Sequence, residues 1–133
     1  MPFQFSTGVR NASLDAIETT VGVSPTLELR SGAAPATCAT ADSGTVLATM
    51  ALPADWMATA SAGSKALAGT WQDTAADAAG TVGHFRVKQG ATCHIQGSVT
   101  ASGGGGDMTL DNAVLAVGQQ VTITAFTLTA GGA

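Results

Sequence analysis

Charge is scarce in this sequence: only 11% of its 133 residues are Asp, Glu, Lys or Arg. Five Lys and Arg residues stand against nine Asp and Glu residues, for a formal net charge of −4. So few cations cannot form a basic face that neutralises many phosphates, which argues against nucleic acid as a partner. A surface with little charge is also poorly suited to a free monomer, and it points to an assembly partner.

Long apolar runs and cysteines are scarce as well. Gly, Ser, Thr and Asp interrupt every apolar stretch before it reaches the roughly 18 to 20 residues of a membrane helix, so no membrane is expected as a partner. Residues 1–10 lack the basic and apolar regions of a secretory signal, which predicts a chain made and retained in a cytoplasm. The two cysteines, Cys38 and Cys93, are too few and too far apart for a zinc site or a disulfide framework. In a reducing compartment both are expected to be free thiols.

What the chain does have is apolar content, with 45% hydrophobic residues and 17 glycines. A disordered chain would show the opposite balance of apolar and charged residues. The length suits one domain with a lightly built core. We expect an N-terminal arm and helix over residues 1–24, followed by a β-sandwich over residues 25–133, within a single domain overall.

One helix is predicted near the N-terminus. Ser6 or Thr7 can cap it, and the pattern fades at Gly22. Apolar or small residues recur at helical spacing and predict an inner face: Val9, Ala12 or Ser13, Ala16, Ile17 and Val21. Asp15 and Glu18 then fall on the outer face.

From residue 26 onward the hydrophobic period is two, which is typical of strands. Alternating runs separated by turn residues predict strands at residues 26–30, 44–52, 82–88, 92–100, 108–110, 114–117 and 120–129. The stretch 54–80 predicts short strands and a long excursion. About eight short strands after one helix indicate a mainly β fold, an antiparallel β-sandwich of jelly-roll type with one short N-terminal helix.

The strand patterns also assign side chains to faces. The clearest strands predict a core that depends on Phe85, Ile95, Ile123 and Phe126. Along residues 92–100, the inward set is Cys93, Ile95, Gly97 and Val99. The opposite, polar strand faces hold His84, Arg86, Lys88, His94, Gln96 and Ser98. In the last strand the parity of the apolar residues changes near Ala125, which predicts a β-bulge or burial of both faces.

No arrangement for catalysis or cofactor binding emerges. Cys93 and His94 are adjacent, so in a strand they point to opposite faces and cannot act as nucleophile and base. His84 is interpreted as a surface histidine on a polar face. The nine carboxylates are scattered singly, and the glycine run at residues 103–106 lacks both a phosphate-binding ending and a repeat, which indicates a loop. We expect no catalytic residue, cofactor or metal.

Five segments that carry no chemistry have a pattern in common with a known class: residues 9–17, 27–32, 83–88, 95–99 and 118–130. Together they resemble small capsid decoration, or cement, proteins of tailed double-stranded DNA bacteriophages. The resemblance implies a non-enzymatic virion protein on the capsid exterior, synthesised in the bacterial host cytoplasm, that stabilises the capsid lattice. It also implies two partners, the major capsid protein and copies of the chain itself in a dimer or trimer.

Phe3 and Phe5 are the predicted partner-binding residues, because a short terminal segment cannot bury two large apolar groups by itself. Two alternatives remain open. One is a tail or neck protein of the same phage class, which should assemble as a ring or tube and show a long hairpin. The other is a receptor- or carbohydrate-binding β-sandwich module that uses Trp56 or Trp71 as a stacking platform.

Overall fold

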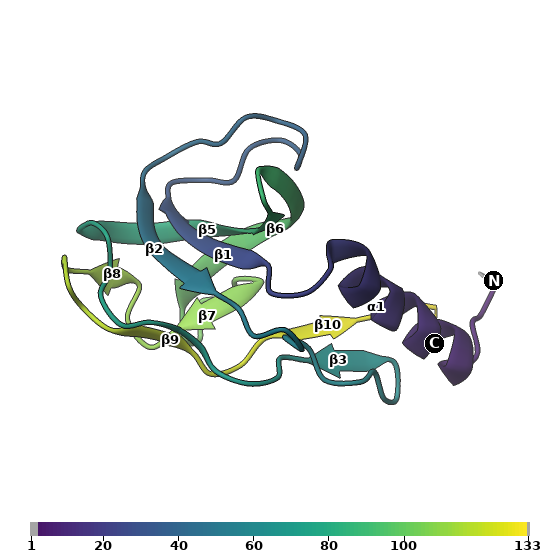
Figure 1. Cartoon of the computed structure of the whole chain (residues 1–133). Coiled ribbons are helices and arrows are strands. Elements are labelled where there is room, and N and C mark those ends of the chain that lie inside the picture. Colours follow the sequence, from purple (N-terminus) through teal and green to yellow (C-terminus); the bar gives the residue numbers. More distant parts are fainter. Residues whose placement is uncertain (1–2, 133) are drawn as a thin grey trace.

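The computed structural model describes residues 3–132 (Figure 1). Within this range the chain forms one helix and ten strands. The helix is α1 (Thr7–Val21), and the strands are β1 (Thr26–Ser31), β2 (Val46–Ala51), β3 (Ser64–Ala66), β4 (Trp71–Asp73), β5 (Gly80–Gln89), β6 (Thr92–Ala101), β7 (Met108–Leu110), β8 (Val114–Leu115), β9 (Val121–Ile123) and β10 (Thr127–Thr129). The predicted mainly β fold with one short N-terminal helix is confirmed.

Local signals set both ends of α1. The Ser6 hydroxyl accepts a hydrogen bond from the Val9 N–H at 3.2 Å, which satisfies a donor that the first turn leaves free. Gly22 ends the helix at φ 94°, and its N–H donates to the Glu18 carbonyl oxygen. Over residues 3–132, α1 included, no helix combines the length and apolarity needed to span a bilayer.

The inner face of α1 differs from the prediction. Val21 is buried and Ile17 partly buried, as predicted, but Leu14 is also buried, and the other predicted inner residues are exposed: Val9, Ala12, Ser13 and Ala16. The assignment of Asp15 and Glu18 to the outer face is wrong, because both carboxylates form ion pairs with a lysine of β3. The buried ammonium of Lys65 on β3 therefore draws the Asp15 and Glu18 side of α1 toward that strand.

The main sheet has the order β2-β1-β5-β6-β7, and β8 pairs with β5. The pairs around β1 and β5 are antiparallel, as predicted, but β6 and β7 run parallel. The glycine run between β6 and β7 allows so short a parallel return. A Cβ on Gly104 or Gly106 would lie within 2.8 Å of atoms of Thr100.

The predicted strand at residues 120–129 is two strands in two separate ribbons. β9 pairs with β4, and β10 pairs with β3. Between them the chain leaves the ladder and turns Phe126 into the core, where the residue is buried. The parity change near Ala125 therefore reflects a change of partner strand and not a bulge. Figure 1 shows β3 and β10 extending away from the main sheet toward α1.

The core lies between the main sheet and the two ribbons. Its aromatic rings form a continuous chain: Trp56 to Trp71, Trp71 to Phe126 and Phe126 to Phe85, with centroids 6.0, 5.7 and 5.5 Å apart. Burial of Phe85, Ile123 and Phe126 is confirmed, whereas Ile95 is only partly buried at the edge of the core. A jelly-roll order of strands does not follow from this topology and stays a prediction.

Candidate functional site

Charged residues line the face of β5 opposite the core. His84, Arg86 and Lys88 share that face, but all three are buried. The connection between β1 and β2, residues 32–45, folds back over them; we call it the covering loop (Figure 1, top). The interpretation of His84 as a surface histidine is therefore wrong: its Nδ1 lies 2.9 Å from the Gly32 carbonyl oxygen at the start of the covering loop.

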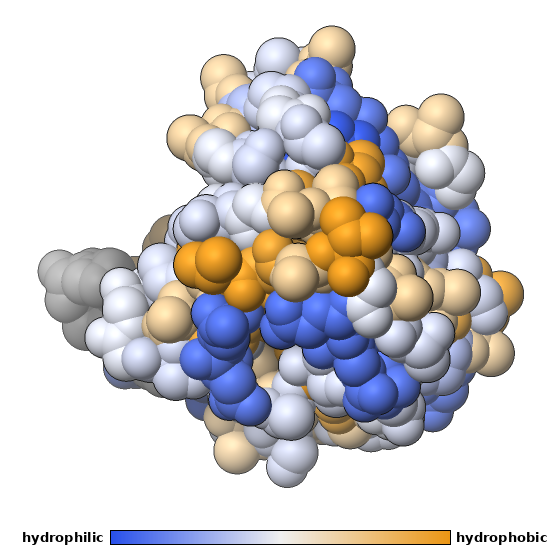
Figure 2. All heavy atoms as spheres, turned by 90° about the vertical axis from the view of Figure 1, so that its left-hand side faces the viewer, coloured by the Kyte–Doolittle hydropathy of each residue, from blue (hydrophilic) through white to orange (hydrophobic). Residues whose placement is uncertain are grey.

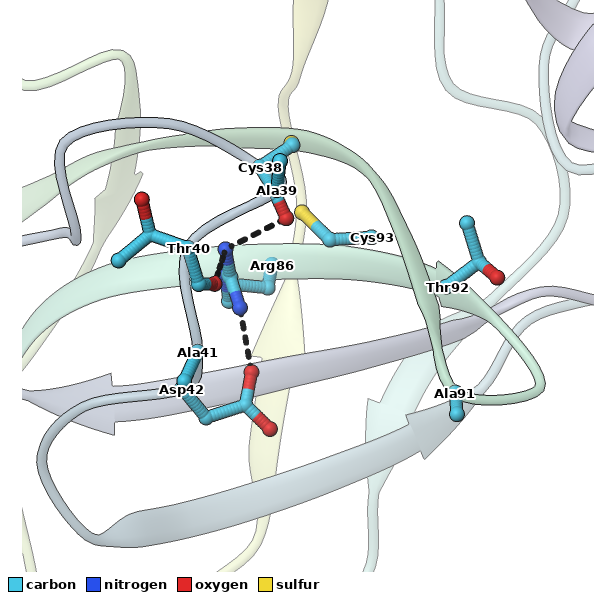
Figure 3. A pocket seen from close by; sticks show the side chains of 9 residues that line it. All are labelled: Cys38, Ala39, Thr40, Ala41, Asp42, Arg86, Ala91, Thr92 and Cys93. Atoms are coloured by element: carbon cyan, nitrogen blue, oxygen red, sulfur yellow. Dashed lines mark hydrogen bonds and ion pairs between the residues drawn. The ribbon is translucent and has the colours of Figure 1, made fainter.

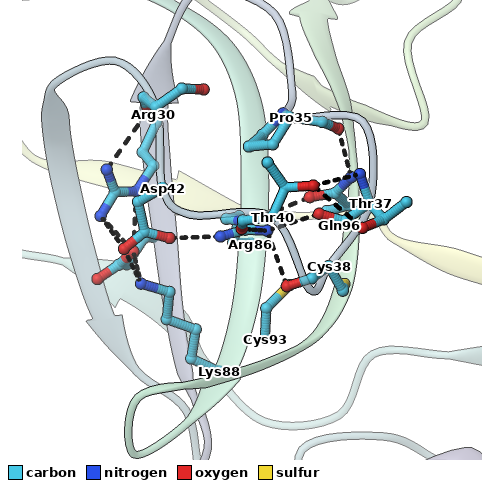
Figure 4. Close-up of polar contacts among 12 residues, drawn as sticks. Arg30, Pro35, Thr37, Cys38, Thr40, Asp42, Arg86, Lys88, Cys93 and Gln96 are labelled. Atoms are coloured by element: carbon cyan, nitrogen blue, oxygen red, sulfur yellow. Dashed lines mark hydrogen bonds and ion pairs between the residues drawn. The ribbon is translucent and has the colours of Figure 1, made fainter.

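Asp42 of the covering loop joins three cations from two strands (Figure 4). Its carboxylate lies 2.5 Å from Arg86 Nη1, 2.5 Å from Lys88 Nζ and 3.1 Å from Arg30 Nη2. Glu28 accepts from Arg30 and Lys88 at 2.9 and 3.0 Å. We call these five residues the ion cluster. It neutralises charges that would be costly to bury alone.

The ion cluster holds fixed charges. Hydrogen bonds from Lys88 and Arg86 lower the pKa of Asp42 to about 2, against the opposing effect of burial. Burial is the largest single effect and would lower the pKa values of Lys88 and Arg86, but hydrogen bonds and nearby charges together outweigh it and raise both, with Asp42 contributing to each and Glu28 to Lys88. All three groups stay ionised at neutral pH, so none is suited to exchange protons there.

Arg86 also holds the backbone of the covering loop. Its Nη2 donates to the carbonyl oxygens of Thr37, Cys38 and Thr40 at 3.1, 3.1 and 3.0 Å. Its Nε donates to Gln96 Oε1 at 3.1 Å. The planar guanidinium spreads its donors as a fork, which a lysine could not reproduce. Arg86 therefore makes more hydrogen bonds to the loop backbone than its neighbours do, and Gln96 adds a bond from its Nε2 to the Pro35 carbonyl oxygen at 2.7 Å.

A cavity of about 670 Å³ opens beside the guanidinium (Figure 3). Its lining residues are Cys38, Ala39, Thr40, Ala41, Asp42, Arg86, Ala91, Thr92 and Cys93.

The predicted placement of Cys93 on the inward face of its strand is wrong. The register shifts after Val87, so that Ile95 pairs with Val87 but Cys93 pairs with Lys88 on the polar face. The shift gives β6 one extra residue, which reverses the parity that strict alternation predicts.

The Cys93 thiol stays protonated at neutral pH. Burial and the neighbouring Cys38 thiol raise the pKa of Cys93 to about 12, so its reactive thiolate form is rare at neutral pH. Asp107, which follows the glycine run, accepts hydrogen bonds from the Ser98 N–H and hydroxyl at 3.0 and 3.2 Å, a structural role in a turn. Across residues 3–132 no three His, Cys, Asp or Glu side chains are grouped so as to hold a metal ion.

The predicted partner-binding residues lie elsewhere, at the end of the molecule where α1 begins. Phe3 and Phe5 are 76% and 46% exposed, and their rings pack edge to face with centroids 5.3 Å apart. The Phe5 N–H donates to the Gly132 carbonyl oxygen at 2.7 Å, which ties this segment to the C-terminal end of the chain. The two rings are thus presented to solvent from an anchored backbone.

Trp56 and Trp71 cannot serve as the proposed sugar platforms. Both side chains have 0% exposure. Each indole N–H is also engaged, that of Trp56 with the Gly22 carbonyl oxygen at 3.0 Å and that of Trp71 with the carbonyl oxygens of Trp56 and Ala68 at 3.2 Å. They are core residues that join the helix end to the ribbons.

Sequence reasoning missed Asp42, the centre of the ion cluster. It lies in a loop rich in Ala, Ser and Thr, where nothing local distinguishes it from a solvated carboxylate. The available signal was on the neighbouring strands, where Arg86 and Lys88 share a face and, once buried, require a negative partner.

Comparisons of the chain with models of protein families, with curated proteins and with solved structures found no match.

Proposed function

We propose that this protein is a non-enzymatic virion structural protein that decorates and stabilises the capsid of a tailed double-stranded DNA bacteriophage. The observation that carries the proposal is the exposed pair Phe3 and Phe5 on an anchored terminal segment. Aromatic groups exposed to solvent on an anchored segment are typical of a contact surface. The proposed partners are the major capsid protein and further copies of this chain, as a dimer or trimer on the capsid exterior.

A second apolar area supports a bridging role. Val114 and Val117 are 58% and 70% exposed, and both lie in or just after β8. Figure 2 views the molecule from that side and shows apolar side chains gathered in a band across the face. In Figure 1, β8 and the N-terminus lie at opposite ends of the molecule. Two separated apolar areas would let one copy contact two neighbouring lattice subunits, and repeated weak contacts of this kind add up over a lattice.

The internal ion pairs also fit this proposal. Each Lys in the described range, and both Arg residues of the ion cluster, are buried against carboxylates inside the molecule. Few cations are left at the surface for a charged substrate or nucleic acid.

The tail or neck alternative calls for a long hairpin, and β5 with β6 form one. However, β5 is paired along its other edge with β1, so the hairpin is part of the sheet and does not project from it.

The test is co-sedimentation with purified phage heads that lack this protein. Deleting residues 1–7 would remove the Ser6 cap of α1, so the sharper variant is the double substitution Phe3→Ala/Phe5→Ala. Val23→Ala is the matched control, because Val23 is a comparably exposed apolar residue in a different segment.

We expect the wild type and Val23→Ala to sediment with heads. The double variant should bind at least about 10-fold more weakly, since buried aromatic anchors dominate interfaces. Its far-ultraviolet circular dichroism spectrum should match that of the wild type. If the wild type does not sediment with heads but binds tails or a soluble glycan, the capsid proposal is overturned.

A further inference from the structure

The covering loop brings together two cysteines that are far apart in the sequence. Cys38 lies in the loop and Cys93 lies near the start of β6, and both line the cavity beside Arg86. Figure 3 shows the Cys93 side chain directed toward Cys38 across this cavity. Their thiols are near enough for Cys38 to contribute directly to the raised pKa of Cys93. Both are free thiols in the structure.

Each cysteine is held in place by contacts of its own. The Cys38 carbonyl oxygen accepts from Arg86 Nη2 at 3.1 Å, as do its neighbours Thr37 and Thr40. Cys93 is fixed by its pairing with Lys88 in the β5–β6 ladder, and its thiol donates to the Ile95 carbonyl oxygen at 3.6 Å. The folded chain thus holds the two sulfur atoms near one another without a covalent bond.

We propose that Cys38 and Cys93 are a modification site at which a low-molecular-weight disulfide forms a reversible intramolecular Cys38–Cys93 bond. The Cys38 thiolate attacks one sulfur of the small disulfide, which forms a mixed disulfide and releases one small thiol. Cys93 then loses its proton and attacks Cys38 Sγ, and the second small thiol leaves. The two protein sulfurs lose two electrons, and the small disulfide gains them as it becomes two thiols.

Access and geometry support this order of steps. Both cysteines line the cavity and are partly exposed, so a small disulfide can approach either thiol, and the protonated state of Cys93 leaves Cys38 as the first to attack. The high pKa of Cys93 delays the second step, because only the thiolate attacks, so closure should accelerate as the pH rises. The bond would fasten the covering loop to β6 covalently, at the place where Arg86 now fastens it by hydrogen bonds. This inference does not depend on the proposed virion function.

The experiment titrates the purified, reduced protein with mixtures of oxidised and reduced glutathione, once in native buffer and once in denaturant. Quenched samples are analysed by intact mass, by peptide mapping and on a non-reducing gel. Cys38→Ser and Cys93→Ser are run alongside, since each should stop the reaction at the mixed disulfide. Thermal melting compares the oxidised and reduced wild-type protein.

The native protein should lose both thiols, weigh two hydrogens less and remain monomeric on the gel. Half-oxidation should require a ratio of oxidised to reduced glutathione about 100-fold lower than in denaturant. The native fold already holds the two thiols close together, so forming the disulfide costs less chain entropy than in the unfolded chain. The oxidised protein should melt about 5 °C higher. Glutathione retained on both cysteines, covalent dimers, or equal ratios in the two solvents would each overturn the proposal.

Discussion

Lys65 Nζ lies 2.6 Å from Asp15 Oδ1, although Lys65 belongs to β3 and Asp15 to α1. The lysine side chain is only 2% exposed, and Glu18 Oε1 and the Ala58 carbonyl oxygen lie 2.9 Å from the same nitrogen. Asp15 also accepts from the Ala60 N–H at 3.0 Å. A buried cation therefore joins the helix to the β3–β10 ribbon, and charge decides which side of α1 faces the ribbon.

Replacing Lys65 should loosen the helix. We expect Lys65→Ala to lower the free energy of unfolding by about 2 kcal/mol, less than for a fully buried pair because the carboxylates left behind stay partly hydrated. Lys65→Met, which keeps the side-chain volume, should lose less. Urea denaturation measures both. A loss below about 0.5 kcal/mol for Lys65→Ala, the range of ordinary surface substitutions, would contradict this role.

Asp42→Asn should release the covering loop. The substitution leaves the Arg86 guanidinium, which is 2% exposed, without its carboxylate partner. We expect a loss of about 2 kcal/mol, discounted from the value for a fully buried pair because the Asp42 side chain is itself partly exposed. Asp55→Asn, which alters an exposed carboxylate, is the matched control and should change stability by less than about 0.5 kcal/mol. Equal losses in the two variants would argue against the ion cluster as an anchor.

The ion cluster also predicts the acid sensitivity of the fold. The pKa of Asp42 is lowered from 3.8 to about 2, so the folded state holds its proton less tightly than the unfolded state does. The contribution of the Asp42 carboxylate to stability is fully present above pH 3.8 and is lost as the pH falls toward 2. Urea denaturation across this range should show a steeper loss for the wild type than for Asp42→Asn. Parallel curves would refute the assignment.

The aromatic core should be more sensitive than its edge. Phe85 and Phe126 are buried and pack edge to face, so truncating either to Ala should cost about 3 to 5 kcal/mol. Ile95 is only partly buried, and Ile95→Ala should cost about 1 kcal/mol. Val23→Ala serves as an exposed control. Ile95 and Phe85 lie on the same face of the β5–β6 hairpin, so a larger loss at Ile95 than at Phe85 would mean that the core is centred nearer the free end of the hairpin than on the aromatic rings.

Local sequence signals place the ends of the helix and of the longer strands. Ser6 begins the helix and Gly22 ends it, because capping and positive φ are preferences of a few adjacent residues. Alternating hydrophobicity located β1, β5 and β6 closely, since strand side chains alternate whatever the partner strand is. These signals act over short distances along the chain, and local sequence is enough to specify them.

Which faces are buried, and which distant residues come into contact, depends instead on how the strands and loops pack together. The register shift at Cys93 moved that residue to the polar face, and the split between β9 and β10 sent one predicted strand to two different partners. Arg86 and Lys88 have the composition of a solvated face, yet the covering loop buries them by supplying Asp42. Ion pairing depends on distance in space and on the water that the rest of the chain excludes. The local pattern of residues specifies neither the distance between the charged groups nor the exclusion of water around them.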